Sequence, residues 1–200
     1  MRAEDQNEVV YVVDDDPSAR ESLCWLLGTE GIASQAFASA QAFLEYWSSD
    51  CNGCIMVDIR MPGKSGLQLQ EELNARHNLM PVIVLTGHAD VPVAIRAMKQ
   101  GAYDFLEKPY ADEELLTCVK TALELGREIS DAESEKARVA GALENLTERE
   151  REVMCLVVEG NTNKAVAARL GISEKTVEIH RARVMEKTAA RSLSELVRIC

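Results

Sequence analysis

The chain has 200 residues, of which 46% are hydrophobic and 28% are charged. This length supports one to two domains, and this composition is typical of a globular protein rather than a disordered one. No apolar run approaches the roughly 18 residues that a membrane-crossing helix needs, and the acidic, polar start lacks the pattern of a signal peptide. We therefore expect a cytoplasmic protein with no membrane partner.

The formal net charge of −11 is unevenly distributed. Residues 141–200 contain ten Lys or Arg against nine Asp or Glu, so the acidic excess lies before residue 141. Within 161–191 there are seven basic residues and three acidic ones. A basic stretch in an acidic protein indicates a local contact with a polyanion.

Of the six cysteines, only Cys51 and Cys54 lie close together in the sequence. A zinc site needs a second pair of ligands, and the sequence offers none at suitable spacing. We interpret Cys54 as the start of a buried strand and Cys51 as part of the loop before it. A redox pair is the alternative.

Five segments predict strands in the first part of the chain, the second of them a poorer strand than the others. Continuous apolar runs of four or five residues are typical of parallel strands that are buried on both faces. The predicted strands are 9–13, 32–37, 54–57 leading to Asp58, 81–87 and 102–107.

Amphipathic segments between and after these strands predict five helices. Asp16 and Pro17 suit the cap and the first position of the first helix, which ends near Gly28 and Gly31. The next three are 39–47 with Ala42, Phe43 and Tyr46 on one face, 66–75, and 90–100 between an Asp90 cap and Gly101. The fifth runs from Asp112 to about residue 138.

Strands that alternate with helices predict a parallel sheet covered on both faces by right-handed crossovers. Four strands lead into polar residues, and parallel strands share one carboxyl edge, so these residues are expected to converge there: Asp14 with Asp15, Asp58, Thr86 and Lys108. Carboxylates packed together repel, and a divalent cation such as Mg²⁺ usually relieves this repulsion. One carboxylate is then free to attack a phosphoryl donor, while Lys108 and Thr86 contact the phosphoryl oxygens.

The pattern after Gly141, where we place the domain boundary, is helical only. Thr147 and Glu150 form a capping box for a helix that ends at Gly160. Three more helices follow: 163–170 closed by Gly171, one capped by Ser173, and one opened by Ser192 with Glu195. Helices joined by a tight glycine turn, with clustered arginines, are typical of a helix-turn-helix.

The third of these helices, 174–188, has two distinct faces. Val177, Val184 and Met185 share the inward face at helical spacing. The opposite face carries Lys175, Glu178, Ile179, Ala182, Arg183 and Glu186. An ordinary solvated face explains the charges but not an exposed isoleucine, whereas entry into a DNA major groove explains both.

Residues from about 8 to 125 resemble the receiver domain of two-component response regulators. The resemblance rests, in order and spacing, on Val12–Asp15, Val57-Asp58-Ile59-Arg60-Met61-Pro62, Leu85–His88 and Phe105–Pro109. It implies an α/β domain at 1–125 with a five-stranded, parallel, doubly wound, flavodoxin-like sheet. It also implies that Asp58 is the phosphoacceptor for a sensor histidine kinase.

The same resemblance assigns roles to the residues around Asp58. It implies that Mg²⁺ is bound by Asp15, Asp58 and the main-chain carbonyl of Arg60, with Asp14 acting mainly through water. Thr86 and Lys108 are implied to contact the phosphoryl group, and Phe105 to be an aromatic switch that moves inward as Thr86 turns. The Lys108–Pro109 bond is implied to be cis. The 90–100 helix and the 102–107 strand are implied to form a dimer face after phosphorylation.

Residues 144–200 resemble the LuxR-type helix-turn-helix, and the whole chain looks most like the FixJ-type branch of response regulators. The resemblance implies an all-α, four-helix DNA-binding domain at 142–200 after a long helical linker at 126–141. Glu178, Ile179 and Ala182 match base-reading positions, flanked by Arg181. The implied backbone contacts are Asn163, Lys164, Lys175, Thr176, His180, Arg183 and Lys187. The last helix, with Leu193, Leu196, Val197 and Cys200, matches one that pairs two such domains.

Together these features predict a regulator rather than an enzyme, limited to Mg²⁺-dependent self-phosphorylation and slow autodephosphorylation. We expect a transcriptional activator that forms a homodimer on phosphorylation, binds double-stranded promoter DNA and acts with RNA polymerase. Whether phosphorylation relieves masking or creates the dimer stays open. Two alternatives also remain. One is a dehalogenase-type phosphatase with Asp14 as nucleophile, although Ser18 departs from its motif and Asp58 then has no role. The other is an assembly module that is never phosphorylated.

Overall fold

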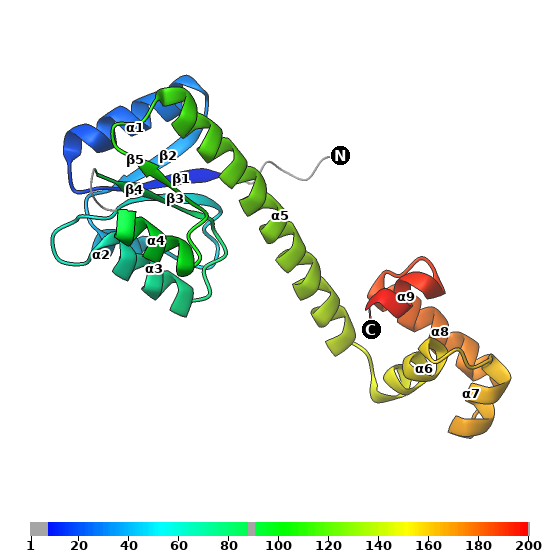
Figure 1. The fold of residues 1–200 in the computed structure, drawn as a ribbon. Helices are drawn as coiled ribbons and strands as arrows, with labels where there is room; N and C mark the ends of the chain where they lie inside the picture. Colours follow the sequence, from blue (N-terminus) through cyan, green and yellow to red (C-terminus); the bar gives the residue numbers. More distant parts are fainter. Residues whose placement is uncertain (1–7, 88–90, 200) are drawn as a thin grey trace. The chain divides into compact units, whose positions relative to one another are not determined.

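The computed structural model describes residues 8–87 and 91–199 of the chain. The chain forms two compact units, Met1–Asp131 and Ala132–Cys200, and helix α5 (Asp112–Glu144) belongs to both (Figure 1). The predictions at His88, Asp90 and Cys200 fall outside the described residues. Among the residues that are described, no helix combines the length and apolarity needed to cross a membrane.

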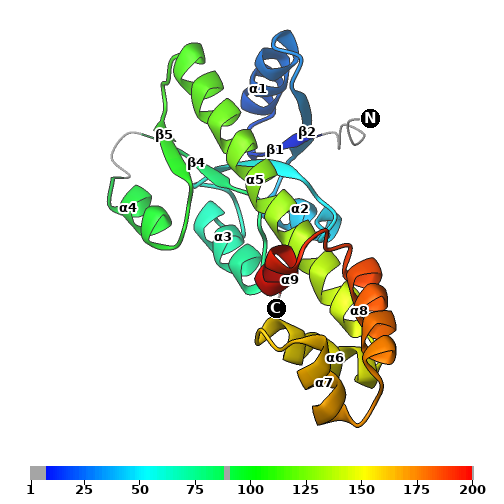
Figure 2. The ribbon, with the colours of Figure 1, turned by 90° about the vertical axis from the view of Figure 1, so that its right-hand side faces the viewer.

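The first unit contains a five-stranded parallel sheet with the order β2-β1-β3-β4-β5. The strands are β1 (Val9–Val13), β2 (Ala33–Phe37), β3 (Gly53–Asp58), β4 (Val82–Thr86) and β5 (Asp104–Glu107). Helices α1 (Pro17–Thr29) and α5 cover one face, and α2 (Ala40–Tyr46), α3 (Gly66–Ala75) and α4 (Val91–Lys99) cover the other (Figures 1 and 2). The predicted α/β fold is therefore confirmed.

The core of this unit has two layers because successive side chains of a strand point to opposite faces of the sheet. In β3, Ile55 and Val57 pack toward α2, α3 and α4, whereas Cys54 and Met56 pack toward α1 and α5. Cys51 packs against the first layer, so the thiols of Cys51 and Cys54 lie on opposite faces of the sheet. Burial raises the pKa of the Cys54 thiol to about 12, which leaves it unreactive. These observations favour the structural interpretation of the two cysteines.

The predicted face of α2 is wrong in part. Phe43 is buried as expected, but its buried neighbours are Ala40 and Leu44, while Ala42 and Tyr46 are exposed. Tyr46 lies at the helix end, where its ring contacts the edge of the aromatic cluster instead of entering it, with ring centroids 5.2 Å from Phe37. Leu44, which the prediction left out, takes the buried position next to Phe43.

Helix α5 is longer than predicted, because it continues past residue 138 and through Gly141 to Glu144. Its exposed second half contains ion pairs at helical spacing, Lys136 with Glu133 and Arg138 with Glu135, which support an isolated helix. The two units divide between Asp131 and Ala132, inside this helix. The domain limits predicted from the sequence, at residues 125 and 141, stay predictions.

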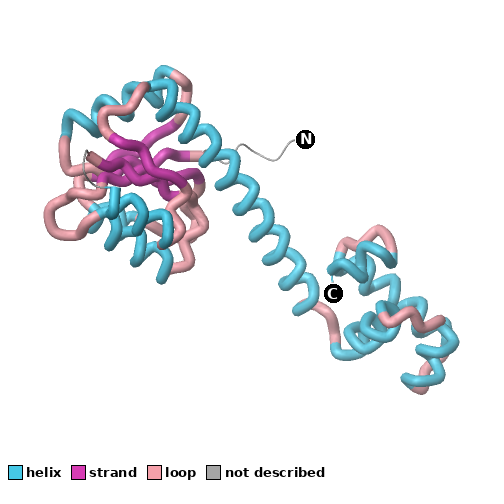
Figure 3. The backbone as a smooth tube through the Cα atoms, in the orientation of Figure 1, coloured by secondary structure: helices cyan, strands magenta, loops and turns pink. Residues whose placement is uncertain are grey.

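The described part of the second unit consists of helices joined by loops, with no strand among these residues (Figure 3). After α5 it contains α6 (Glu148–Val158), α7 (Asn163–Leu170), α8 (Glu174–Thr188) and α9 (Leu193–Ile199). The predicted capping box of Thr147 and Glu150 is present, and Gly171 closes α7 in the left-handed conformation with φ of 65°. Val153 of α6, Val166 of α7 and Val177 of α8 meet in one core cluster. This cluster packs α7 and α8, the two helices of the helix-turn-helix, against α6.

Candidate functional site

The polar ends of four strands meet at the carboxyl edge of the sheet, as the sequence predicts for a parallel sheet. Asp14 follows β1, Asp58 ends β3, Thr86 ends β4 and Lys108 follows β5. The Lys108 ammonium donates to Asp14 Oδ2 at 2.9 Å and to Asp58 Oδ1 at 2.6 Å. One cation therefore joins two carboxylates that are 44 residues apart in the sequence.

The site is partly enclosed. The side chain of Asp14 is 2% exposed, that of Asp58 is 13% exposed and that of Lys108 is 31% exposed. Burial by itself would lower the pKa of the Lys108 ammonium, but its hydrogen bonds to Asp58 and Asp14 outweigh burial and raise the pKa. Lys108 therefore carries its positive charge at neutral pH. The Asp58 side chain remains partly exposed to solvent.

The remaining carboxylate oxygens are held by the main chain. Asp14 Oδ1 accepts from the Asp16 amide at 2.9 Å, and Asp58 Oδ2 accepts from the Arg60 amide at 2.6 Å. Arg20, which sequence reasoning missed, donates from Nη1 to the Asp14 main-chain oxygen at 2.6 Å. Its position one turn after the Asp16 cap was the available signal. These bonds fix where the carboxylates point.

The donor set suits a hard divalent cation. Asp15 is exposed beside Asp14, and the carboxylates of Asp15 and Asp58 with the Arg60 carbonyl are oxygen ligands of the kind that Mg²⁺ prefers. Within the described parts of the chain, no group of three or more His, Cys, Asp or Glu is arranged to hold a metal ion. Mg²⁺ uses one or two carboxylates together with waters and phosphate oxygens.

Thr86 and Phe105 lie on the neighbouring strands β4 and β5. The Thr86 side chain is buried, and its hydroxyl donates to the Gly87 main-chain oxygen at 3.3 Å. Phe105 is 41% exposed. The resemblance to receiver domains implies this outward position for Phe105 before the aromatic side chain moves inward.

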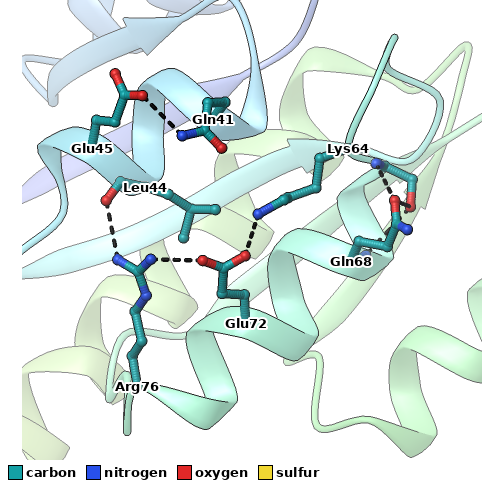
Figure 4. A network of polar contacts seen from close by, with 8 residues as sticks. Gln41, Leu44, Glu45, Lys64, Gln68, Glu72 and Arg76 are labelled. Carbon is teal, nitrogen blue, oxygen red and sulfur yellow. Dashed lines mark hydrogen bonds and ion pairs between the residues drawn. The ribbon is translucent and has the colours of Figure 1, made fainter.

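The loop between β3 and α3 is tied to two helices by a polar network that the sequence did not reveal (Figure 4). Lys64 in this loop pairs with Glu72 of α3, whose second oxygen accepts from Arg76 Nη2 at 2.6 Å. Arg76 also donates from Nη1 to the Leu44 main-chain oxygen of α2 at 3.1 Å. The loop that carries the Arg60 carbonyl is thereby attached to the helical layer.

Gly66 lets α3 begin close to Asp58. A Cβ atom at Gly66 would lie 2.4 Å from the Asp58 main-chain oxygen. The Gly66 amide donates to the Ile59 main-chain oxygen at 3.1 Å, and Ser65 with Gln68 forms a capping box at this end of α3. Only glycine permits this close approach.

In the second unit, α8 presents the two faces that its sequence predicts. Val177 and Val184 are buried, and Met185 is half-buried. The exposed residues include Ile179, which is 47% exposed, and four others predicted to contact DNA: Lys175, Glu178, Ala182 and Arg183. Lys164 is exposed on α7, and the Thr176 hydroxyl bonds the Ser173 hydroxyl at 2.8 Å.

Other residues predicted to contact DNA are engaged inside the unit. Arg181 Nη1 donates to Asn163 Oδ1 at 2.6 Å, so this pair connects α8 to α7. Lys187 Nζ donates to Glu150 Oε2 at 2.7 Å and to the Asn145 main-chain oxygen at 3.0 Å. His180 is half-buried, and its buried Nδ1 has no partner within the described residues. Sequence reasoning missed the internal role of Lys187.

Helix α9 leaves part of its apolar stripe uncovered. Leu196 is buried against α6 and α8, whereas Leu193 is 42% exposed and Val197 is 46% exposed. These two residues are one helical turn apart, so they lie on the same face.

Comparison with known proteins assigns a domain family to each part of the chain. Residues 10–120 match the response regulator receiver domain, and residues 144–200 match the luxR family of bacterial regulatory proteins. The chain is 48% identical to the transcriptional regulatory protein FixJ of Azorhizobium caulinodans, over 95% of this chain and 90% of that protein. It is 46% identical to nodulation protein W of Bradyrhizobium diazoefficiens, over 96% of this chain and 84% of that protein.

Two solved structures extend over both units. The response regulator StyR superposes with a TM-score of 0.90 at 40% identity, covering 96% of this chain and 98% of that one. Full-length FixJ from B. japonicum superposes with a TM-score of 0.59 at 40% identity, covering 96% and 95%.

A receiver sheet with an acidic carboxyl edge, joined to a helix-turn-helix, defines a response regulator that controls transcription. Its receiver domain implies a sensor kinase as partner, and its second domain implies DNA. The chain belongs to the response regulators with a LuxR-type DNA-binding domain, and FixJ proteins are among its relatives. This architecture is that of a regulator.

Proposed function

We propose that a sensor histidine kinase transfers a phosphoryl group to the Asp58 carboxylate, and that this transfer promotes dimerisation and promoter binding. The observation that carries the proposal is the Lys108 ammonium between Asp14 and Asp58, at 2.9 and 2.6 Å. A fixed cation at this point neutralises the charge of incoming phosphoryl oxygens. The Asp58 carboxylate is the attacking nucleophile because it is the more exposed of the two.

Asp15, Asp58 and the Arg60 carbonyl would hold Mg²⁺, with Asp14 acting through water. When bound, Mg²⁺ supplies further positive charge to the transferring phosphoryl oxygens. Thr86 ends β4 at the same edge, and its hydroxyl turns from Gly87 to donate to a phosphoryl oxygen. Phe105 then moves inward from its exposed position.

Helix α8 binds the DNA and helix α9 pairs two copies of the DNA-binding unit. The exposed face of α8 around Ile179 enters the major groove, with Glu178 and Ala182 at the base edges. Lys164, Lys175 and Arg183 contact the DNA backbone from exposed positions. Leu193 and Val197 pair two copies of the DNA-binding unit, and the bound dimer activates transcription with RNA polymerase.

Two features argue against a phosphatase that uses Asp14 as nucleophile. The Asp14 side chain is 2% exposed against 13% for Asp58, so it is the less accessible of the two carboxylates to a phosphoryl donor. The Asp-x-Asp motif of such phosphatases would also use Asp16, but the Asp16 carboxylate caps α1 by accepting from the Ser18 amide at 2.9 Å.

The test is beryllofluoride with Mg²⁺, added to the full chain and followed by sedimentation and by binding to promoter fragments. The wild type is expected to dimerise and to bind more tightly, whereas Asp58→Asn is expected to stay unresponsive. Asp16→Asn is the matched control, because its amide oxygen can still cap α1. An Asp58→Asn variant that responds as the wild type does would show that Asp58 is not the acceptor.

A further inference from the structure

Helix α4 is the element that follows β4, the strand that ends at Thr86. The carboxyl end of α4 packs on α3 through amide side chains. Gln70 Nε2 of α3 donates to the Ala97 main-chain oxygen of α4 at 3.1 Å. Asn74 Nδ2 donates to the Gln100 main-chain oxygen at 2.7 Å.

A further bond joins the Gln100 side chain to Glu71 of α3, with Gln100 Nε2 as donor. We call this contact the α3–α4 seam, formed by Gln70, Glu71, Asn74, Ala97 and Gln100. Helices that pack on a core usually meet through apolar side chains. In this seam the buried contact, that of Gln70 with the Ala97 oxygen, is polar instead, whereas Asn74 and Glu71 are exposed.

The seam leaves two buried acceptors unpaired. Among the described residues, three buried side-chain polar atoms have no hydrogen-bond partner: Gln70 Oε1, Gln100 Oε1 and His180 Nδ1. Two of the three lie in the seam. Gln70 is 1% exposed, so bulk water does not reach its amide. A buried carbonyl that lacks a donor destabilises the arrangement that buries it.

The orientation of the Gln70 amide is fixed by its neighbour. Ala97 offers a carbonyl oxygen, so only Nε2 can face it, and Oε1 must point elsewhere. The Ala97 main-chain oxygen also accepts from two main-chain N–H groups, that of Gln100 at 3.1 Å and that of Ala102 at 3.0 Å. The bond from Gln70 therefore adds little to Ala97, while its unpaired oxygen reduces stability.

We infer that Gln70 and Gln100 are positioning residues that set how readily α4 leaves α3 when Asp58 is phosphorylated. The inference rests on the proposed function. In the unphosphorylated chain the seam keeps α4 docked with two unpaired acceptors. When α4 shifts, these oxygens gain access to water, so release is easier than it would be from an apolar contact. The phosphoryl group then needs less binding free energy to shift the equilibrium.

The test replaces Gln70 with methionine in the full chain. Methionine has similar length and no oxygen acceptor, so Gln70→Met is expected to raise the Tm of the receiver unit by about 2–4 °C. Amide exchange at Ala97–Ala102 is expected to slow. The beryllofluoride concentration for half-maximal dimerisation, at fixed Mg²⁺, is expected to rise about fivefold or more. Gln41→Met is the matched control, because Gln41 is exposed and hydrogen-bonds to Glu45 of its own helix, and it is expected to change none of these values.

Gln70→Glu tests the opposite direction. At this position, which is 1% exposed, Glu would bury a negative charge against the Ala97 oxygen, so this variant is expected to have a lower Tm and to dimerise at lower beryllofluoride concentration. If Gln70→Met lowers the Tm, or leaves the dose response of a responsive protein unchanged, the inference is overturned. A wild type that does not dimerise refutes the proposed function itself, so the two failures are distinguishable. Should Gln70→Glu not fold, Gln70→Met alone decides.

Discussion

The Lys187 ammonium lies 2.7 Å from Glu150 Oε2, a carboxylate whose side chain is 3% exposed. This bond joins α8 to the start of α6, where the same carboxylate also accepts from the Thr147 amide at 2.9 Å. A cation on the DNA-reading helix thus has a structural role within its own domain.

The Glu150 contact predicts a loss of stability in acid. The hydrogen bond from Lys187, followed by the one from Thr147, lowers the pKa of the Glu150 carboxyl from 4.5 to about 2. Because the folded-state pKa is lowered, the contribution is complete above pH 4.5 and is lost as pH falls toward 2. Glu150→Gln is expected to unfold at lower Tm than the wild type at pH 7, and the difference is expected to shrink toward pH 2.

Thermal unfolding of the second unit between pH 7 and 2.5 provides the measurement. Glu148→Gln is the control, because Glu148 is exposed on the same helix. A Tm difference between Glu150→Gln and the wild type that stays constant across this range would contradict the assignment.

Two lysines on α8 are expected to behave differently in DNA binding. Lys175 is exposed, so Lys175→Ala is expected to weaken binding to all sequences and to reduce the slope of log affinity against log salt by about 0.9. Lys187→Ala leaves the Glu150 carboxylate without its cation, so its main effect is expected to be a lower Tm. Titrations of promoter DNA at several salt concentrations, paired with melting curves, separate the two. Equal salt slopes for Lys175→Ala and the wild type would exclude a phosphate contact.

The sequence predicted the sheet, its carboxyl edge and the inward face of α8 because periodicity and strand ends determine these features. It did not predict that α2 buries Leu44 rather than Tyr46, since the residues that a helix end packs against are distant in sequence. The length of α5 was also missed. Gly141 is a weak helix former, but the surrounding alanines and ion pairs carry the helix past it.

The internal contacts were harder to predict than the strand ends. Lys187 looked like a phosphate contact because it is basic and lies on α8, but its partner Glu150 is 37 residues earlier in the chain. Arg20 and the α3–α4 seam were missed for the same reason, since nothing in local spacing shows which main-chain oxygen a long side chain reaches. In contrast, Asp14, Asp58 and Lys108 share a topological cause, the common edge of a parallel sheet, which the sequence does reveal.

Lys108→Met is expected to make stability depend on Mg²⁺. Without the ammonium, Asp14 and Asp58 lose the cation that separates them, and Asp14 is 2% exposed. The Tm in a chelator is therefore expected to fall below that of the wild type, because two close carboxylates repel. Millimolar Mg²⁺ is expected to raise the Tm of this variant more than that of the wild type. Lys120→Met is the control, since Lys120 pairs with Glu30 at the surface. Equal Mg²⁺-induced shifts in Lys108→Met and the wild type would contradict a competition between Lys108 and the ion for these carboxylates.

Gly66→Ala is expected to impair phosphorylation without removing any reacting group. The new methyl group would lie 2.4 Å from the Asp58 main-chain oxygen, and that oxygen is backbone, so the loop after Asp58 has to shift. A displacement of about 1 Å near a reacting group can lower the rate about 100-fold. We therefore expect Gly66→Ala to lower the rate of phosphorylation by acetyl phosphate by about tenfold or more. Gly28→Ala is the matched control, because a Cβ at Gly28 meets nothing within 4 Å and alanine favours its helix. Single-turnover phosphorylation of the three proteins measures the effect. If Gly66→Ala reacts at the rate of Gly28→Ala, the position of the loop after Asp58 does not limit the reaction.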